Sequence, residues 1–594
     1  MNTKKIIISL ATTIIPVAVA LADEINQTIT VEREVEIVEQ KVEKPYSLPE
    51  ALPLKTDEVK LQFSDHTVPA DFNPLLVTQT PHRRFDGFAF DNKRGYAVFG
   101  MGNYLNISGS AGYRAIATEK SQLNLWLQHN STNGTVKDSK KKVIEDRIGA
   151  YGSHIFSAGT LSADLNYHFD KFNYYSLDNI YDRNKSQTLN EVGVNLGWLS
   201  NNDDKEGFGY HFDFGYNYLG YGDAMQAISQ QVITAKGLKE HALTTTAGVE
   251  FMWDEDSHVG IDATMGYVKT INSYLCLDDA NRVLYKNVAN SLFSANPYYQ
   301  KYTDRLRLRL GARIDVASKG TTFRIAPDVK FDYSFTDRVA VALSATGGNH
   351  QNTLHEVIAH NRYAGCIQAI APNSFTLIDA EARLNLGMWK GFSISPYFGF
   401  KITKNQLMPL IKVDNDLNNC PSAITAISGG TPYDTDDING IKLGVDAAYK
   451  WSNIVEVKAG YRFTPQDDDS GWVTQGFERA DHTITAGITV SPIKKLTINA
   501  DYCYLSGRTI TMILTDKTGL ETRREGNMGT ICDFSIGATY QINDLINVYA
   551  QGQNLFNRRY WEALGCYNQG PRFMLGAGIK FQLNHSMIET NSVA

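Results

Sequence analysis

Residues 305–335 read RLRLRLGARIDVASKGTTFRIAPDVKFDYSF, and this stretch decides the fold class. In its first half every second residue is apolar, from Leu306 to Val316, and charged residues fill most of the alternate positions. Successive side chains of a β-strand point to opposite faces, so this run has one hydrocarbon face and one charged face. The second half, from Phe323 to Phe335, repeats the pattern. The two runs therefore predict a β-hairpin.

The charged face of this hairpin carries six basic and three acidic side chains, which are Arg305, Arg307, Arg309, Arg313, Arg324, Lys330, Asp315, Asp328 and Asp332. We call these nine residues the charged patch. Asp379, Glu381 and Arg383 continue it further along the chain. One interpretation is that these groups form cross-strand ion pairs that hydrate and stiffen a wall. The other is a patch that selects a solute, or a surface on which an inserted segment docks.

Similar alternating runs recur after Gly95, and we count about 22 of them, the last ending near Phe581. The clearest apolar sets lie within residues 161–169, 192–198, 208–218, 259–267, 378–386 and 441–451. So many two-faced strands in series favour one closed sheet, whose apolar outside meets lipid and whose polar inside lines a lumen. The predicted fold class is an all-β, transmembrane antiparallel β-barrel over residues 94–583.

The connections between these runs alternate in length. The short ones are residues 118–121, 157–159, 254–258, 303–304, 336–337, 452–453 and 543–544, and the long ones are 131–144, 220–239, 271–295, 347–373, 403–438 and 506–527. Transmembrane barrels have short periplasmic turns and long outer loops. The rhythm therefore predicts an even number of strands, with both ends of the chain in the periplasm.

The N-terminus has the pattern of an export signal. Lys4 and Lys5 precede an apolar run, and Ala20-Leu21-Ala22 is a small-residue cleavage pattern, so we expect a signal peptide over residues 1–22. A net charge of -7 and a pI near 6.0 give no reason to expect that the protein binds nucleic acid. These features predict an integral protein of the outer membrane of a Gram-negative cell.

Residues 23–93 differ in composition from the rest of the chain. They hold six of the 17 prolines, and residues 28–42 alternate loosely between β-branched and charged side chains. We expect an extended periplasmic segment with three alternative roles: a disordered tail, a strand added to a partner's sheet, or a stretch tucked into the lumen. Residues 584–594 form a short C-terminal tail.

No motif indicates an enzyme, a cofactor or a metal. His355 and His360 lie five residues apart, about 140° around a helix, so they do not form the paired ligands of a zinc-protease helix, and a loop helix without metal is expected. Six cysteines allow 15 pairings. Cys503 and Cys532 lie on consecutive predicted strands, and their disulfide is the pairing to test first.

The C-terminal region resembles a known family. The run Asn554-Leu555-Phe556-Asn557-Arg558-Arg559-Tyr560, followed by Pro571-Arg572 and an alternating last strand, resembles the C-terminus of TonB-dependent receptors. The resemblance implies a 22-stranded outer-membrane transporter with its lumen plugged by an N-terminal domain. Here residues 23–93 are too few, and too often interrupted by proline, to form such a plug.

The segment Thr28-Ile29-Thr30-Val31-Glu32 resembles the short box by which these receptors engage TonB, and it is a candidate for binding a periplasmic protein. Two functions stay open. The first is a plugless transport channel or receptor for a small solute. The second is a non-transporting scaffold that recruits a periplasmic partner through its N-terminal segment.

Overall fold

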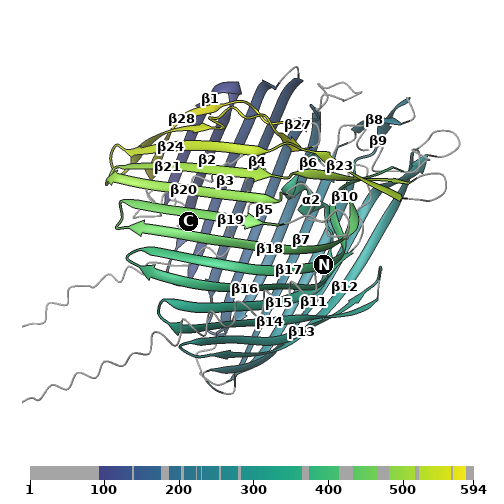
Figure 1. Cartoon of the computed structure of the whole chain (residues 1–594), viewed down its shortest axis with the longest axis vertical. Helices are drawn as coiled ribbons and strands as arrows, with labels where there is room; N and C mark the ends of the chain where they lie inside the picture. The colour runs from purple at the N-terminus through teal and green to yellow at the C-terminus, as the bar shows by residue number, and fades with distance from the viewer. Residues whose placement is uncertain are drawn as a thin grey trace, which may run out of the picture. The chain divides into compact units, whose positions relative to one another are not determined.

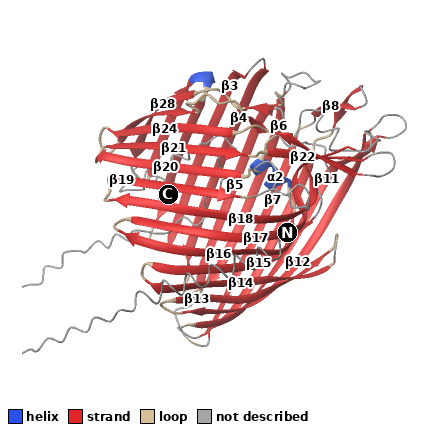
Figure 2. Ribbon diagram, in the orientation of Figure 1, coloured by secondary structure: helices blue, strands red, loops and turns tan. Residues whose placement is uncertain are grey.

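The computed structural model describes residues 93–136, 139–175, 186–201, 207–222, 224–228, 231–252, 254, 256–277, 283–320, 322–363, 373–413, 433–464, 480–515, 521–563 and 566–582. Nearly all of this part of the chain is β-strand (Figure 2). The predicted signal peptide, residues 28–32 with the rest of the extended segment up to residue 92, and the C-terminal tail lie outside the described residues.

Within the described residues, 22 strands form one closed antiparallel ring, which confirms the predicted fold class and strand number (Figure 1). They are β1 (Gly95–Gly102), β2 (Ile107–Ala117), β3 (Ser121–Val136), β4 (Ser139–Ile155), β5 (Gly159–Asn173), β6 (Ser186–Ser200), β7 (Gly207–Tyr221), β10 (Lys239–Met252), β11 (Ser257–Leu277), β12 (Val283–Tyr302), β13 (Leu306–Ala317), β14 (Phe323–Thr336), β15 (Val339–Gln351), β16 (Asn373–Trp389), β17 (Phe392–Val413), β18 (Tyr433–Trp451), β19 (Val455–Phe463), β20 (His482–Ile493), β21 (Leu496–Ser506), β24 (Ile531–Gln541), β25 (Ile546–Gln553) and β28 (Arg572–Phe581). Each strand pairs with the next one in this series, and β1 pairs with β28 to close the ring.

The remaining elements lie in connections at one end of the ring, which we call the long-loop end. They are the 3-10 helix η2 (Asn103–Leu105), the hairpins β8 (Ala224–Ile228) with β9 (Gln231–Ala235) and β22 (Thr509–Thr515) with β23 (Glu521–Asn527), the helix α2 (Leu354–His360), and the small pair β26 (Trp561–Ala563) and β27 (Cys566–Tyr567). No helix among the described residues is long and apolar enough to cross a bilayer. The opposite end carries the short turns.

The faces of the ring follow the alternation in the sequence. Apolar side chains of the predicted sets are exposed on the outer face, as at Leu165, Phe212 and Ile261. The alternate positions carry charged and amide side chains toward the lumen, where Asp315 is fully buried. Arg307 pairs with Asp332 in the ladder between β13 and β14, so residues 305–335 form the predicted hairpin.

In two predicted long loops, the strands of the ring itself continue beyond the predicted apolar runs. Residues 131–144 continue β3 to Val136 and start β4 at Ser139, and residues 271–295 hold the ends of β11 and β12. The reason is that backbone hydrogen bonds continue along two paired strands even where neither face is apolar. The alternation of side chains therefore marks the apolar band of the wall and not the full length of its strands.

Candidate functional site

The end of strand β15 turns into the lumen. Its pairing with β16 shifts in register between Thr346 and Gly348, and Gly348 has a φ of 127°, which glycine adopts at little cost. The backbone N–H of Asn349 then donates to Asp315 Oδ2 at 2.5 Å, and its carbonyl accepts from Arg313 Nη2 at 2.7 Å. Because β14 lies between β13 and β15 in the ring, these bonds draw the chain across the inner face of β14.

We call residues 349–363 the strap, because they cross the inner wall from one strand to the next. After β13, the Gln351 amide donates to the carbonyl oxygens of Gly266 on β11, at 3.4 Å, and of Asn290 on β12, at 3.2 Å. Helix α2 follows, at the long-loop end of the ring (Figure 1). The strap is therefore held by contacts with the wall and does not extend away from the barrel.

The first turn of α2 is fixed by a buried carboxylate. The backbone N–H of Leu354 donates to both carboxylate oxygens of Glu240 on β10, each at 2.8 Å, and Glu240 is 2% exposed. The Thr353 side chain caps the helix by accepting from the backbone N–H of Glu356 at 3.2 Å. A negative group at this position satisfies the free N–H groups that begin a helix.

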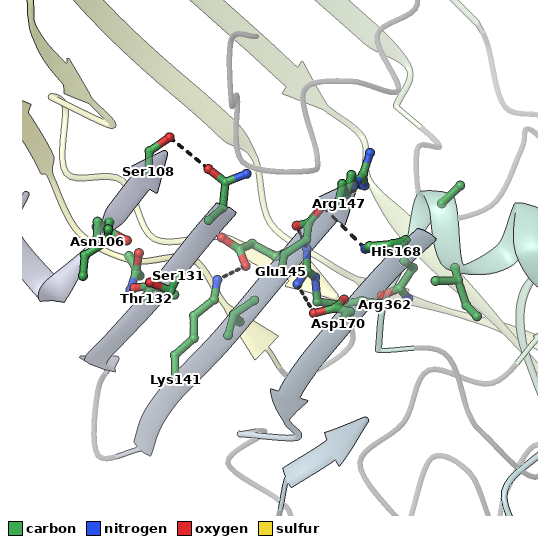
Figure 3. Close-up of a pocket in the computed structure, with 18 of the residues that line it drawn as sticks. Asn106, Ser108, Ser131, Thr132, Lys141, Glu145, Arg147, His168, Asp170 and Arg362 are labelled. Carbon is green, nitrogen blue, oxygen red and sulfur yellow. Dashed lines mark hydrogen bonds and ion pairs between the residues drawn. The ribbon is translucent and has the colours of Figure 1, made fainter. Parts of the chain in front are cut away.

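Arg362, at the far end of the strap, binds two carboxylates from neighbouring strands (Figure 3). Its Nη1 donates to Asp170 of β5 at 2.9 Å, and its Nη2 donates to Glu145 of β4 at 2.8 Å. Arg147 adds a second cation to Glu145 at 2.7 Å. Burial opposes the charge of Arg362, but the two carboxylates outweigh it and raise the pKa of Arg362. Arg362 is therefore permanently charged.

His355 of α2 forms an ion pair with Glu191 of β6. Glu191 is shared with His168, at 3.3 Å, and with the side-chain amide of Asn217, at 2.9 Å. The hydrogen bond from His355 to Glu191 raises the pKa of His355 above its usual value of 6.5, while partial burial opposes this effect. Protonation of His355 therefore strengthens the attachment of the strap.

Apolar contacts supplement these polar ones. Leu354, Ile358 and Tyr363 of the strap are buried in a cluster with inward side chains of the wall, which are Val136, Val143, Phe172, Leu189, Leu219, Tyr221 and Leu238. The Tyr363 ring packs edge-on against Phe172 with centroids 5.6 Å apart. The strap is thus bound by a hydrophobic face as well as by carboxylates.

A second loop, described over residues 554–563 and 566–571, lies at the same end of the ring and contains the family-like motif. Asn554 has a φ of 49°, and its side-chain amide donates to the carbonyl of Gln569 at 2.8 Å. This folds the loop inward, where Glu562 forms an ion pair with Lys141 of β4 and the Tyr567 carbonyl accepts from Tyr175 at 2.7 Å. The motif residue Asn554 therefore shapes the loop.

A cavity of about 340 Å³ lies between the strap, the second loop and the inner wall formed by strands β2 to β6, β25 and β28 (Figure 3). It falls in the size range of small-molecule sites. Its lining includes seven Asn or Gln side chains, the hydroxyl residues Ser108, Ser131 and Thr132, and the indole of Trp126. The cavity therefore combines many hydrogen-bonding groups with aromatic side chains, which are Trp126, Tyr167, Tyr363 and Phe573.

Members of the predicted charged patch lie on the opposite part of the wall and do not line this cavity among its described residues. Arg309 donates to Asp328 at 2.7 Å, lies 3.5 Å from Asp262 and stacks on the Tyr298 ring at 3.8 Å. Arg313 donates to Asp315 at 2.9 Å. These residues are joined in pairs along the wall.

The other patch residues are less tightly held. The Arg324 guanidinium lies 4.0 Å from the centroid of Phe375. Arg307, Lys330 and Asp332 are exposed, and Arg305 lies in the turn before β13. The patch is therefore not one continuous site, and it meets the strap at Arg313 and Asp315.

The predicted Cys503–Cys532 bridge is wrong, because both thiols are free. In the ladder between β21 and β24, Cys503 lies opposite Asp533 and Cys532 lies opposite Tyr504. This offset of one residue directs the two side chains to opposite faces of the wall. The pairing was suggested by strand order alone, which does not give the register.

Sequence reasoning missed the wall carboxylates that bind the strap, which are Glu145, Asp170, Glu191 and Glu240. A signal was available, because each is an inward position near the long-loop end of its strand. Acidic side chains at such positions on successive strands predict a basic partner folding in from a loop. Arg362 itself stands in a loop with no distinguishing pattern.

No family model matches the sequence, and no curated protein matches it. Solved structures do match the fold. The siderophore receptor PirA from Acinetobacter baumannii is 10% identical, with a TM-score of 0.60 over 83% of this chain and 81% of that chain. The pyoverdine receptor FpvA from Pseudomonas aeruginosa PAO1 is 13% identical, with a TM-score of 0.59 over 82% of this chain and 78% of that chain. The copper transporter OprC is 11% identical, with a TM-score of 0.59 over 82% of this chain and 81% of that chain.

The closed ring of 22 strands with a polar interior is an outer-membrane type of β-barrel. More particularly, its fold resembles the barrel of TonB-dependent receptors, as these solved structures show.

Proposed function

We propose that this protein is an outer-membrane transporter-like barrel without a plug domain, and that it binds and admits a small polar solute at its long-loop end. The apolar outer face meets the lipid of the outer membrane, the long-loop end faces outward, and the short turns and both ends of the chain are periplasmic. The extended N-terminal segment remains a candidate for binding a periplasmic protein.

One observation carries the proposal: a cavity lined by charged, amide and aromatic side chains lies beside the strap, and the strap is fixed to the wall by charged side chains. A structural wall needs no inward loop held by four buried carboxylates, since burying charges is costly unless they are paired. For the strap to move aside, Arg362 must leave Glu145 and Asp170. In this proposal the strap is a movable closure of the access to the cavity.

Single-channel recording in planar bilayers tests this function. Arg362→Met removes the cation that joins the strap to β4 and β5, so we expect larger or more frequent openings than in the parent protein. Arg383→Met is the matched control, because Arg383 also joins carboxylates in the lumen, with Asp446 at 2.7 Å and Glu381 at 3.1 Å, but is outside the strap. The control should leave the frequency of opening unchanged.

The scaffold function gives a different result. In that case the parent, Arg362→Met and Arg383→Met would all be electrically silent. A periplasmic protein would also co-purify in stoichiometric amount and be lost when residues 23–44 are deleted. These two results together would replace the transport proposal by the scaffold.

A further inference from the structure

Most charged groups around the cavity are paired with one another within the protein. Its lining holds the basic side chains Lys141, Arg147, Arg362 and Arg572 and the carboxylates Glu145, Asp164, Asp170, Glu191 and Glu562. The imidazoles of His168 and His355 also line the cavity, and both lie against Glu191. Lys141 pairs with Glu562, and Arg147 and Arg362 pair with Glu145. A strongly charged ligand that breaks one of these pairs would leave a buried partner charge uncompensated, which is costly. The cavity therefore favours a ligand with no net charge.

The same lining keeps polar atoms that have no partner in the described structure. Asn361 is 5% exposed, and its Oδ1 accepts from the backbone N–H of Tyr363 at 2.9 Å, which leaves Nδ2 as a free donor. Gln569 is 3% exposed, and its Nε2 donates to Thr132 Oγ1 at 2.8 Å, which leaves Oε1 as a free acceptor. Arg572 Nε is a further free donor.

Buried polar atoms without partners are rare in proteins and call for an explanation. Among the described residues, two of the amides with an unpaired buried atom line this cavity, one as a donor and the other as an acceptor, and their other hydrogen bonds fix which atom is which. A hydroxyl group both donates and accepts. A ligand with several hydroxyls would satisfy both kinds of atom without introducing a charge.

Trp126 supplies an apolar surface beside these groups. Its indole lies across Gly149 of the adjacent strand, where any Cβ would overlap the ring. The absence of a side chain at Gly149 lets the indole lie close to the wall, and Trp126 is only partly buried. The apolar C–H face of a sugar ring packs on such an aromatic surface while its hydroxyls point to the edges.

We propose that the cavity is a binding site for a neutral, hydroxyl-rich solute of the sugar or polyol class, with Trp126 as the stacking surface and Asn361 and Gln569 as hydrogen-bonding partners. This inference rests on the proposed function, since it names the class of solute that enters beneath the strap. A volume of about 340 Å³ suits a ligand of one or two rings.

Titration calorimetry on the full-length protein in lipid nanodiscs tests the proposal. The neutral probes are methyl glucoside, maltose and myo-inositol, and the charged probes are glucuronate and glucosamine. We expect at least one neutral probe to bind, at least tenfold more tightly than either charged probe. Trp126→Ala and Gln569→Leu should each weaken this binding at least tenfold.

Asn385→Leu is the matched control. Asn385 accepts from Ser395 at 2.8 Å in another part of the lumen, outside the cavity lining, so its loss should not change the affinity. Heat-modified migration in gels verifies that each variant forms a barrel. If Trp126→Ala fails to fold, Gln569→Leu carries the test.

Three results would overturn the inference: no neutral probe binds, a charged probe binds more tightly, or neither variant weakens binding. If this happens while Arg362→Met still opens the channel, only the class of solute is wrong. If the channel also stays silent, the proposed function fails with it.

Discussion

Replacing Arg362 with Met should release the strap from the wall. The substitution removes one guanidinium that serves two buried carboxylates, Glu145 with a side chain 8% exposed and Asp170 with one 2% exposed. Removing one partner of a buried ion pair costs about 3–5 kcal/mol. Since Arg362 is 24% exposed, we take the lower end, about 3 kcal/mol. This corresponds to roughly a 100-fold increase in the population of the open strap.

Hydrogen exchange of the protein in nanodiscs, followed by mass spectrometry, measures this increase in the population of the open strap. Peptides covering residues 349–363 should exchange roughly 100-fold faster in Arg362→Met, while those from β13 stay unchanged. Arg383→Met removes an arginine of nearly equal exposure, 25%, and should leave the strap unaffected. Equal exchange of the strap in the parent and in Arg362→Met would refute the reasoning that these ion pairs hold it.

Three further perturbations follow from the same contacts. Glu191 raises the pKa of His355, so the stabilisation of the docked strap is complete below pH 6.5 and is lost as the pH rises through the raised value. The exchange rate of the strap, divided by the intrinsic rate of the same peptides at each pH, should therefore rise in alkaline solution, and His355→Gln should remove that rise. Leu354 is 1% exposed, so Leu354→Ala should cost about 2–5 kcal/mol, measured as faster strap exchange, and an unchanged rate would count against its role in the cluster. Gly149→Ala should displace the Trp126 indole and weaken sugar binding in calorimetry, whereas full affinity would contradict the stacking surface.

The architecture was predictable from the sequence because its cause is local. A strand between lipid and lumen must alternate, so Leu306, Leu308 and Leu310 on one side of Arg307 and Arg309 indicate both the strand and its two faces. The ends of the strands were less predictable. Thr135 pairs with Lys140 although neither belongs to an apolar face, because the backbone ladder does not depend on the side chains.

The candidate site was not predictable, because its contacts join distant parts of the chain. Arg362 meets Asp170 across 192 residues and Glu145 across 217 residues. Nothing near Arg362 in the sequence selects these partners, which depend on the register of the strands and on the inward turn at Gly348. The Cys503–Cys532 prediction failed for the same reason, since a one-residue offset reverses the face.

The central claim is that the strap closes the outer access to the cavity, and thiol labelling in intact cells tests it most directly. Gln551→Cys places a thiol in the cavity lining, and a membrane-impermeant maleimide is added from outside the cell. After the labelling of the parent chain is subtracted, Gln551→Cys should be labelled slowly. The double variant Gln551→Cys with Arg362→Met should be labelled roughly 100-fold faster. Equal labelling rates with and without Arg362→Met would contradict the claim.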